Sequence, residues 1–150
     1  MKSSKTYKQI IGTVIGLATG ALAFIFVNRM LYPEAHLEAE GNIFYKIQKM
    51  VNEMNRIVPV QVNETMNFDS IFINRDNTLS YNYTMTKLYK DSVDLINFEQ
   101  QQMPTLIHNI KTKESLDLIR IGQVTVVYRY YDKNGELFST ITISPDMYMY

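Results

Sequence analysis

An uncharged run of 18 residues near the start of the chain, "IIGTVIGLATGALAFIFV", constrains this sequence more than any other feature. The run extends from Ile10 to Val27, and only Thr13 and Thr19 within it are polar. A stretch of this length and apolar character is typical of a helix that crosses a lipid bilayer. We therefore expect a transmembrane helix over residues 10–31.

A cleaved signal peptide is the alternative interpretation of the same run. Signal peptides have apolar regions of about 7–15 residues, followed by small residues at the cleavage site. Here the run is longer, and its small-residue triplet, Ala21-Leu22-Ala23, lies inside it and is followed by more large apolar residues. These features favour an anchor that is retained.

Charge on either side of the run predicts its orientation. Lys2, Lys5 and Lys8 precede it, whereas all 15 acidic residues of the chain follow it, together with 11 of the 15 basic ones beyond position 32. Positive charge favours the cytoplasmic side of a membrane. We expect a bacterial inner-membrane protein whose C-terminal domain is periplasmic. Its predicted parts are a cytoplasmic N-terminus (1–9), the transmembrane helix (10–31), a connector (32–41) and an extracytoplasmic domain (42–150).

Three glycines, Gly12, Gly16 and Gly20, are spaced four residues apart within the apolar run. On a membrane helix this spacing places them on one side, where a second helix can approach closely. Glycine is also simply common in membrane helices, which is the plainer explanation. The pattern predicts helix packing at these three positions, either with a second copy of the chain or with a protein partner.

The remaining sequence has patterns of both helices and strands. Residues 42–57 place apolar side chains on one helical face, and Pro59 marks the end of that segment. Residues 66–74 and 78–86 read as two strands joined by a turn, because the second alternates apolar and polar residues strictly. This first unit is therefore predicted to be a helix followed by a hairpin.

A second unit of the same kind follows. A helix is expected after Asp91 or Ser92, with a kink or a split at Pro104, and a short helix over 114–119. Strands over 123–131 and 136–144 flank Asn134-Gly135, a strong hairpin signal. The fold class we expect is α+β, in which the transmembrane helix precedes an α-β-β-α-β-β domain with helices on one face of a four-stranded antiparallel sheet.

Three stretches carry a resemblance to known proteins: "MNRIVPVQVNETMNFDSIFI", "TLSYNYTM" and "VTVVYRYYDKNGELFSTITIS". In the order of their elements they resemble small bacterial exported or membrane-anchored proteins of unknown function, and the domain is similar to the periplasmic pilotins of type II secretion. Such pilotins guide a secretin to the outer membrane. The resemblance covers residues 42–144 and rests on element order, so it assigns no functional residue. Those pilotins are lipoproteins, whereas this chain has no cysteine to carry a lipid.

The sequence offers little catalytic chemistry. Without cysteine it has no thiol nucleophile and no zinc–thiolate site. Its two histidines, His36 and His108, do not have the spacing of a metal motif, and no nucleophile elbow or phosphate-binding loop occurs. We predict no catalytic residue, no metal and no cofactor. Because the part beyond the apolar run is mildly acidic, nucleic acid is not an expected partner either.

Four tyrosines occur at spacing two on predicted strands: Tyr81, Tyr83, Tyr128 and Tyr130. They fit either core packing or a surface for a protein partner, since tyrosine is enriched in interfaces. The function we predict is a single-pass inner-membrane protein whose periplasmic domain binds a protein partner and is not an enzyme. The alternatives are a membrane-tethered hydrolase-type enzyme, which would use His108 with a nearby acid, and a sensor of an envelope ligand.

Overall fold

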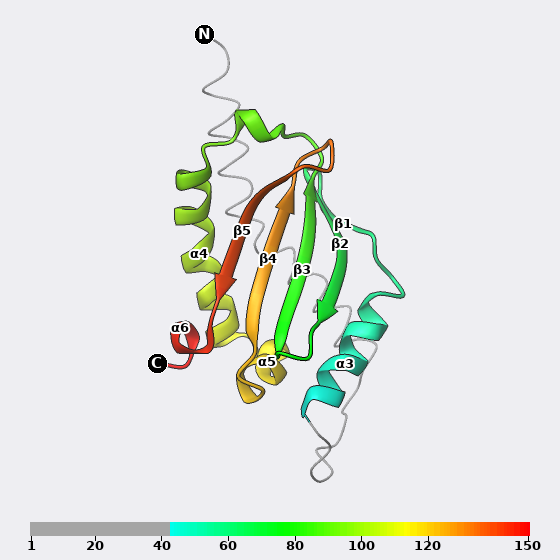
Figure 1. The fold of residues 1–150 in the computed structure, drawn as a ribbon, viewed down its shortest axis with the longest axis vertical. Helices are drawn as coiled ribbons and strands as arrows, with labels where there is room; N and C mark the ends of the chain where they lie inside the picture. Colours follow the sequence, from blue (N-terminus) through cyan, green and yellow to red (C-terminus); the bar gives the residue numbers. More distant parts are fainter. Residues whose placement is uncertain (1–42) are drawn as a thin grey trace.

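The computed structural model describes residues 43–150, which form a mixed five-stranded sheet with helices packed against it (Figure 1). The strands lie in the order β1-β2-β3-β4-β5. Neighbouring strands are antiparallel except for β3 and β4, which run parallel at the centre of the sheet. The strands are β1 (Val60–Asn63), β2 (Met66–Ile73), β3 (Thr78–Met85), β4 (Thr125–Tyr131) and β5 (Leu137–Ile143).

The two longer helices lie towards opposite edges of this sheet. Helix α3 packs on β2 and helix α4 on β5, and the short helix α5 contacts both of them. In Figure 1, α4 runs beside β5 and α3 lies on the side of β2. The helices are α3 (Ile43–Met54), α4 (Leu95–Thr112), α5 (Asp117–Ile121) and α6 (Pro145–Tyr148), with single 3-10 turns η1 (Lys90–Ser92) and η2 (Glu114–Leu116).

Side chains at the ends of the helices fix where they begin and end. Asp94 caps the start of α4, because its carboxylate accepts a hydrogen bond from the Asn97 N–H at 3.1 Å. Just after α3, the Asn55 amide donates to the Ile71 carbonyl at 2.7 Å and accepts from the Ile71 N–H at 3.1 Å. Asn55 thus ties the end of α3 to a bulged part of β2.

Two turns take the backbone conformations that their residue types allow. Asn77, before β3, has a φ of 63°, and its amide donates to the carbonyls of Gly122 and Gln123 at 2.7 and 3.2 Å. This joins the start of β3 to the segment that leads into β4. Gly135, in the turn between β4 and β5, has a φ of 81°, which glycine adopts without strain.

The core lies between the helices and one face of the sheet. Alternate residues of β3 and β4 point into it, and they include Leu79, Met85 and Val126, all with 0% exposure. On the other face the side chains are more polar, and Thr140 and Thr142 on β5 are exposed, as is Phe72 on β2. This division follows the period of two in each strand.

The structure corrects the predicted fold class. A four-stranded antiparallel sheet and an α-β-β-α-β-β order are wrong, because a fifth strand, β1, is present and β3 pairs in parallel with β4. The chain crosses from β3 to β4 through α4, and such a crossover permits parallel pairing, whereas a hairpin does not. Pro104 neither splits nor ends α4, which continues from Leu95 to Thr112.

Nothing tests the predicted transmembrane helix directly, since residues 10–31 lie outside the described residues. The glycines Gly12, Gly16 and Gly20 lie outside them too, so their role in helix packing stays a prediction. Within residues 43–150, none of the helices combines the length and the apolar character that crossing a bilayer requires.

Candidate functional site

The four predicted tyrosines come together on the helix-covered face of the two central strands. Tyr81 stacks on Tyr128 with ring centroids 5.3 Å apart, and Tyr83 stacks on Tyr130 at 5.6 Å. Each pair is in register across the parallel β3–β4 ladder. We call these four residues the tyrosine array.

Two phenylalanines extend the array sideways. Phe68 on β2 lies 5.9 Å from Tyr81 and 5.2 Å from Tyr83, measured between ring centroids. Phe98 on α4 meets Tyr130 edge-on at 5.0 Å and an interplanar angle of 81°. The rings therefore connect β2, both central strands and α4 in one aromatic cluster.

The rings of the array are almost fully covered. Their exposed fractions are 7% for Tyr81, 4% for Tyr83, 6% for Tyr128 and 4% for Tyr130. Burial raises the pKa of each phenol, and in Tyr83 and Tyr128 the neighbouring tyrosines raise the pKa further. The array is thus part of the core, and a partner can reach it only at its rim.

The helices on either side of the array carry half-buried apolar side chains, and we call these side chains its rim. Helices α3 and α4 pack on β2 and β5, so β3 and β4 lie between them in the sheet. On α3, Met50 lies one turn from the buried Ile47 and Met54, and on α4, Met103 lies one turn from Glu99 and Ile107. The half-buried apolar side chains that these helices and α5 contribute are Ile43, Met50, Met103, Ile107 and Leu118. Methionine is flexible and polarizable, which suits it to contact surfaces that adapt to a partner.

A polar group interrupts the apolar inner face of α4. Gln102 is 2% exposed and lies one turn after Phe98, yet among residues 43–150 its Nε2 has no hydrogen-bond partner. Nearby, the Ser139 hydroxyl on β5 donates to the Glu99 carboxylate at 2.9 Å. An unpaired buried amide costs free energy of folding. Such a cost is more typical of a functional region than of a core selected for stability.

The sequence did not single out Met50, Met103 or Gln102. Their signal is weak, because methionine at the side of an apolar helical stripe is ordinary core composition. The tyrosines were found from their period of two. Their role as a surface for a protein partner stays a prediction.

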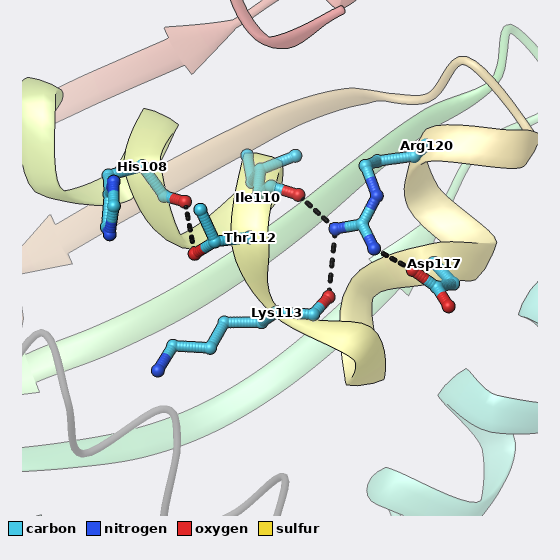
Figure 2. A network of polar contacts seen from close by, with 6 residues as sticks. All are labelled: His108, Ile110, Thr112, Lys113, Asp117 and Arg120. Carbon is cyan, nitrogen blue, oxygen red and sulfur yellow. Dashed lines mark hydrogen bonds and ion pairs between the residues drawn. The ribbon is translucent and has the colours of Figure 1, made fainter.

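A polar network at the end of α4 lies near His108, the histidine that the enzyme alternative would use (Figure 2). The Arg120 guanidinium donates to the carbonyl oxygens of Ile110 and Lys113 and forms an ion pair with Asp117. These contacts satisfy carbonyl groups that the end of a helix leaves unpaired.

His108 takes no side-chain part in this network. It is exposed, its backbone carbonyl accepts a hydrogen bond from the Thr112 hydroxyl, and Figure 2 shows its imidazole apart from Asp117. In the part of the chain that the structure describes, no three His, Asp or Glu side chains gather as they would around a metal ion. No observation here favours a hydrolase, and His36 lies outside the described residues.

A buried carboxylate organises the opposite end of the domain. Asp132, 1% exposed, accepts hydrogen bonds from the backbone N–H groups of Asn134, Glu136 and Lys90, at 2.8, 2.9 and 3.0 Å. Burial raises the pKa of this carboxyl, but the three N–H donors and the Lys90 charge outweigh that effect and lower it below its ordinary value. Asp132 joins the β4–β5 turn to the segment before α4, which is a structural role.

The fold resembles three solved structures of bacterial proteins. Two are pilotins of the type 2 secretion system. EpsS of Vibrio vulnificus has a TM-score of 0.53 and 7% identity, and the match covers 71% of this chain and 91% of EpsS. AspS of Vibrio cholerae has a TM-score of 0.52 and 7% identity, and the match covers 71% of this chain and 92% of AspS. The third is a candidate secreted protein of Pseudomonas aeruginosa, with a TM-score of 0.52 and 9% identity, and the match covers 73% of this chain and 98% of that protein. The expected resemblance to pilotins is confirmed at the level of the fold.

The family assignment comes from the sequence itself. Residues 43–138 match DUF8479, a domain of unknown function, and because this match spans more than half of the chain, the protein belongs to that family. No curated protein matches the sequence.

Proposed function

We propose that this chain is a non-enzymatic protein of the bacterial envelope whose α+β domain, on the periplasmic side, binds a protein partner. The rim of the tyrosine array is the proposed contact surface. The observation that carries the proposal is the pair of half-buried methionines, Met50 and Met103, on the two helices that pack towards opposite edges of the sheet.

The chemistry of this region suits a protein rather than a small polar ligand. Aromatic rings and methionine side chains bury large apolar areas and are enriched in protein interfaces. The hydroxyls of the array add polar groups at the ring tips, and no hydrogen bond joins them to other residues of 43–150. Gln102 adds a buried donor that no other residue in the described part of the chain accepts from. A partner that presents apolar side chains with a few acceptors would complement these groups.

The fold likeness supports the proposed class and location. Two of the similar structures are named as pilotins of a secretion system and a third as a candidate secreted protein. A place in a secretion system agrees with a role in binding another protein. Since identities of 7–9% show the fold alone, the partner of this chain has to be found by experiment.

The test uses the full chain, tagged and purified in mild detergent from its native host. Met50→Glu and Met103→Glu place a carboxylate at the rim, on either side of the array. We expect each to lower recovery of the co-purifying partner at least tenfold, because burying an unpaired charge in an interface is costly. Thermal unfolding of each variant checks that the domain remains folded.

Matched controls lie on the exposed faces of the same helices. Tyr45 on α3 is 68% exposed, and Gln100 on α4 is exposed as well. Tyr45→Glu and Gln100→Glu introduce the same charge and should leave recovery unchanged. Full recovery with both rim variants, in folded protein, would overturn the proposal.

A further inference from the structure

The tyrosine array lies in the middle of the sheet, between the helices that cover its two sides. Helices α3 and α4 pack on β2 and β5, which are three strand spacings of about 4.8 Å apart. Helices seated on these strands have axes about 14 Å apart, whereas helices in direct contact lie about 8–10 Å apart. Helix α5 lies where β3 and β4 begin, since the Asn77 amide before β3 donates to the carbonyl of Gly122, directly after α5 (Figure 1). The middle of the face therefore falls between these three helices.

The tips of the four rings are nonetheless out of water. Among residues 43–150, the aromatic contacts of Tyr81, Tyr83 and Tyr128 are all with rings on strands, and Tyr130 alone meets a ring on a helix, that of Phe98. Side chains stand upright on a sheet, so neighbouring rings cover one another's faces but not their tips. All four are at most 7% exposed, and burial raises the pKa of each phenol. The ring contacts do not supply this cover.

The apolar run Ile10–Val27 has the shape and chemistry of such a cover. A helix turns about 100° per residue, so the three glycines of the run, spaced four apart, share one side if the run is helical. A face without side chains lets a helix backbone come close to rings that already fill the space above the sheet. Ile15 and Leu17, about 100° to either side of Gly16, provide large apolar side chains on both flanks.

The length of the run and its connection to the domain also fit. As a helix its 18 residues are about 27 Å long, and β3, with eight residues, is about 26 Å long. Residues 28–42 join the run to α3 and span up to about 50 Å when extended, while a domain of about 100 residues has a radius of gyration of about 13 Å. A short tether also keeps the run at a local concentration of about millimolar, which favours the array of the same chain over that of a second copy.

We propose that the apolar run Ile10–Val27 lies as a helix over the tyrosine array of its own chain, between α3 and α4, with its glycine face against the rings. In this position the run belongs to the domain rather than to a bilayer, and its flanks pack towards Met50 and Met103 on the two helices. The proposal goes beyond the proposed function and does not depend on it, because the cover comes from the same chain.

Photochemical cross-linking of the full chain in its native host tests this position. A photoreactive residue replaces Leu17, on the flank of the glycine face, or Ala18, about 200° from Gly16 and so on the opposite side. We expect the Leu17 probe to form an adduct within its own chain, which mass spectrometry of the peptides assigns to α3 or α4, and the Ala18 probe to form at least tenfold less of it. Adducts of the Leu17 probe with lipid or with a second copy, in place of α3 or α4, overturn the proposal.

A second measurement follows the phenols themselves. Gly16→Ile sets a branched side chain between the run and the rings, whereas Ala18→Ile, on the opposite side, is the matched control. In the purified full chain, ultraviolet absorbance at a pH about one unit above the ordinary phenol pKa of 10.0 should show at least two more ionised tyrosines in Gly16→Ile than in the parent, and no change in Ala18→Ile. Circular dichroism at the same pH checks that the domain is folded. Equal ionisation in the two variants overturns the proposal, and because no partner is present, neither measurement depends on partner recovery.

Discussion

Phe98 offers the sharpest test of how α4 is held on the sheet. Its ring, 1% exposed, meets Tyr130 at 5.0 Å and Phe138 at 5.4 Å, both edge-on. An aromatic pair of this geometry adds about 0.5–1.5 kcal/mol beyond the burial of its surface. Phe98→Leu keeps an apolar side chain but loses both pairs, so we expect it to lower the free energy of unfolding by about 1–3 kcal/mol. Phe98→Ala also opens a cavity and should cost about 3–5 kcal/mol.

The assay is denaturant unfolding of the full chain followed by circular dichroism, with Ile96→Ala as the control. Ile96 lies on the same helix but is 71% exposed, so its replacement should change the free energy of unfolding by less than about 0.5 kcal/mol. If Phe98→Leu lowered the free energy of unfolding by less than about 0.5 kcal/mol, the edge-on pairs would not matter and the reasoning would be refuted. A loss for Ile96→Ala as large as that for Phe98→Ala would equally contradict the burial shown by the structure.

Three further predictions concern buried groups. Asp132→Asn replaces the oxygen that accepts from the Lys90 N–H, so the variant should be less stable than the parent at pH 7. Because folding lowers the pKa of Asp132, the stability that its carboxylate contributes is present above the ordinary value of 3.8 and is lost as pH falls through the folded pKa. Unfolding measured from pH 7 to 2 should therefore show the stability difference between parent and variant shrinking in acid. Gly122→Ala would place a Cβ 2.9 Å from the Leu118 carbonyl oxygen and 3.1 Å from the Ile47 side chain, so it should lower stability by about 1–3 kcal/mol, and an unchanged melting temperature would contradict this close packing. Gln102→Met removes a buried amide whose Nε2 has no partner among residues 43–150, at nearly equal helix propensity. Thermal unfolding should show a gain in stability of about 1–3 kcal/mol, and the variant should recover less of the partner. A loss of stability would mean that the amide is hydrogen-bonded in solution.

Local strand and turn patterns made some strands predictable from the sequence to within one residue. The predicted strands 66–74 and 78–86 correspond to β2 (Met66–Ile73) and β3 (Thr78–Met85). The turn at Asn134-Gly135 fixed the β4–β5 hairpin in the same way, because Gly135 adopts a positive φ there. Local patterns of this kind depend on neighbours in the sequence, so they can be seen without the fold.

The contact between β3 and β4 could not be predicted in this way. Their pairing joins residues more than 40 positions apart, such as Thr78 with Thr125, and both strands would alternate equally well in either direction. Strand β1 was missed because four residues next to Pro59 give too short a pattern. These two misses, one of tertiary pairing and one of a short element, made the predicted fold class wrong.

The candidate site was predictable only in part. Spacing showed that Tyr81, Tyr83, Tyr128 and Tyr130 each face one side of their strand, but the stacking between strands needs the parallel register. Their deep burial also moves the proposed contact from the rings to the rim. Met50 and Met103 become noteworthy only once α3 and α4 are seen to pack on strands β2 and β5, either side of the array.

The central claim is that the rim of the tyrosine array binds a protein, and site-specific photo-cross-linking tests it most directly. A photoreactive residue replaces Met103, which is half-buried at the rim, or Gln100, which is exposed on the same helix, in the full chain within its native host. The account predicts that Met103 yields one defined adduct that is lost in Met50→Glu, and that Gln100 yields none. Adducts from Gln100 alone, or an adduct from Met103 that Met50→Glu leaves unchanged, would contradict it.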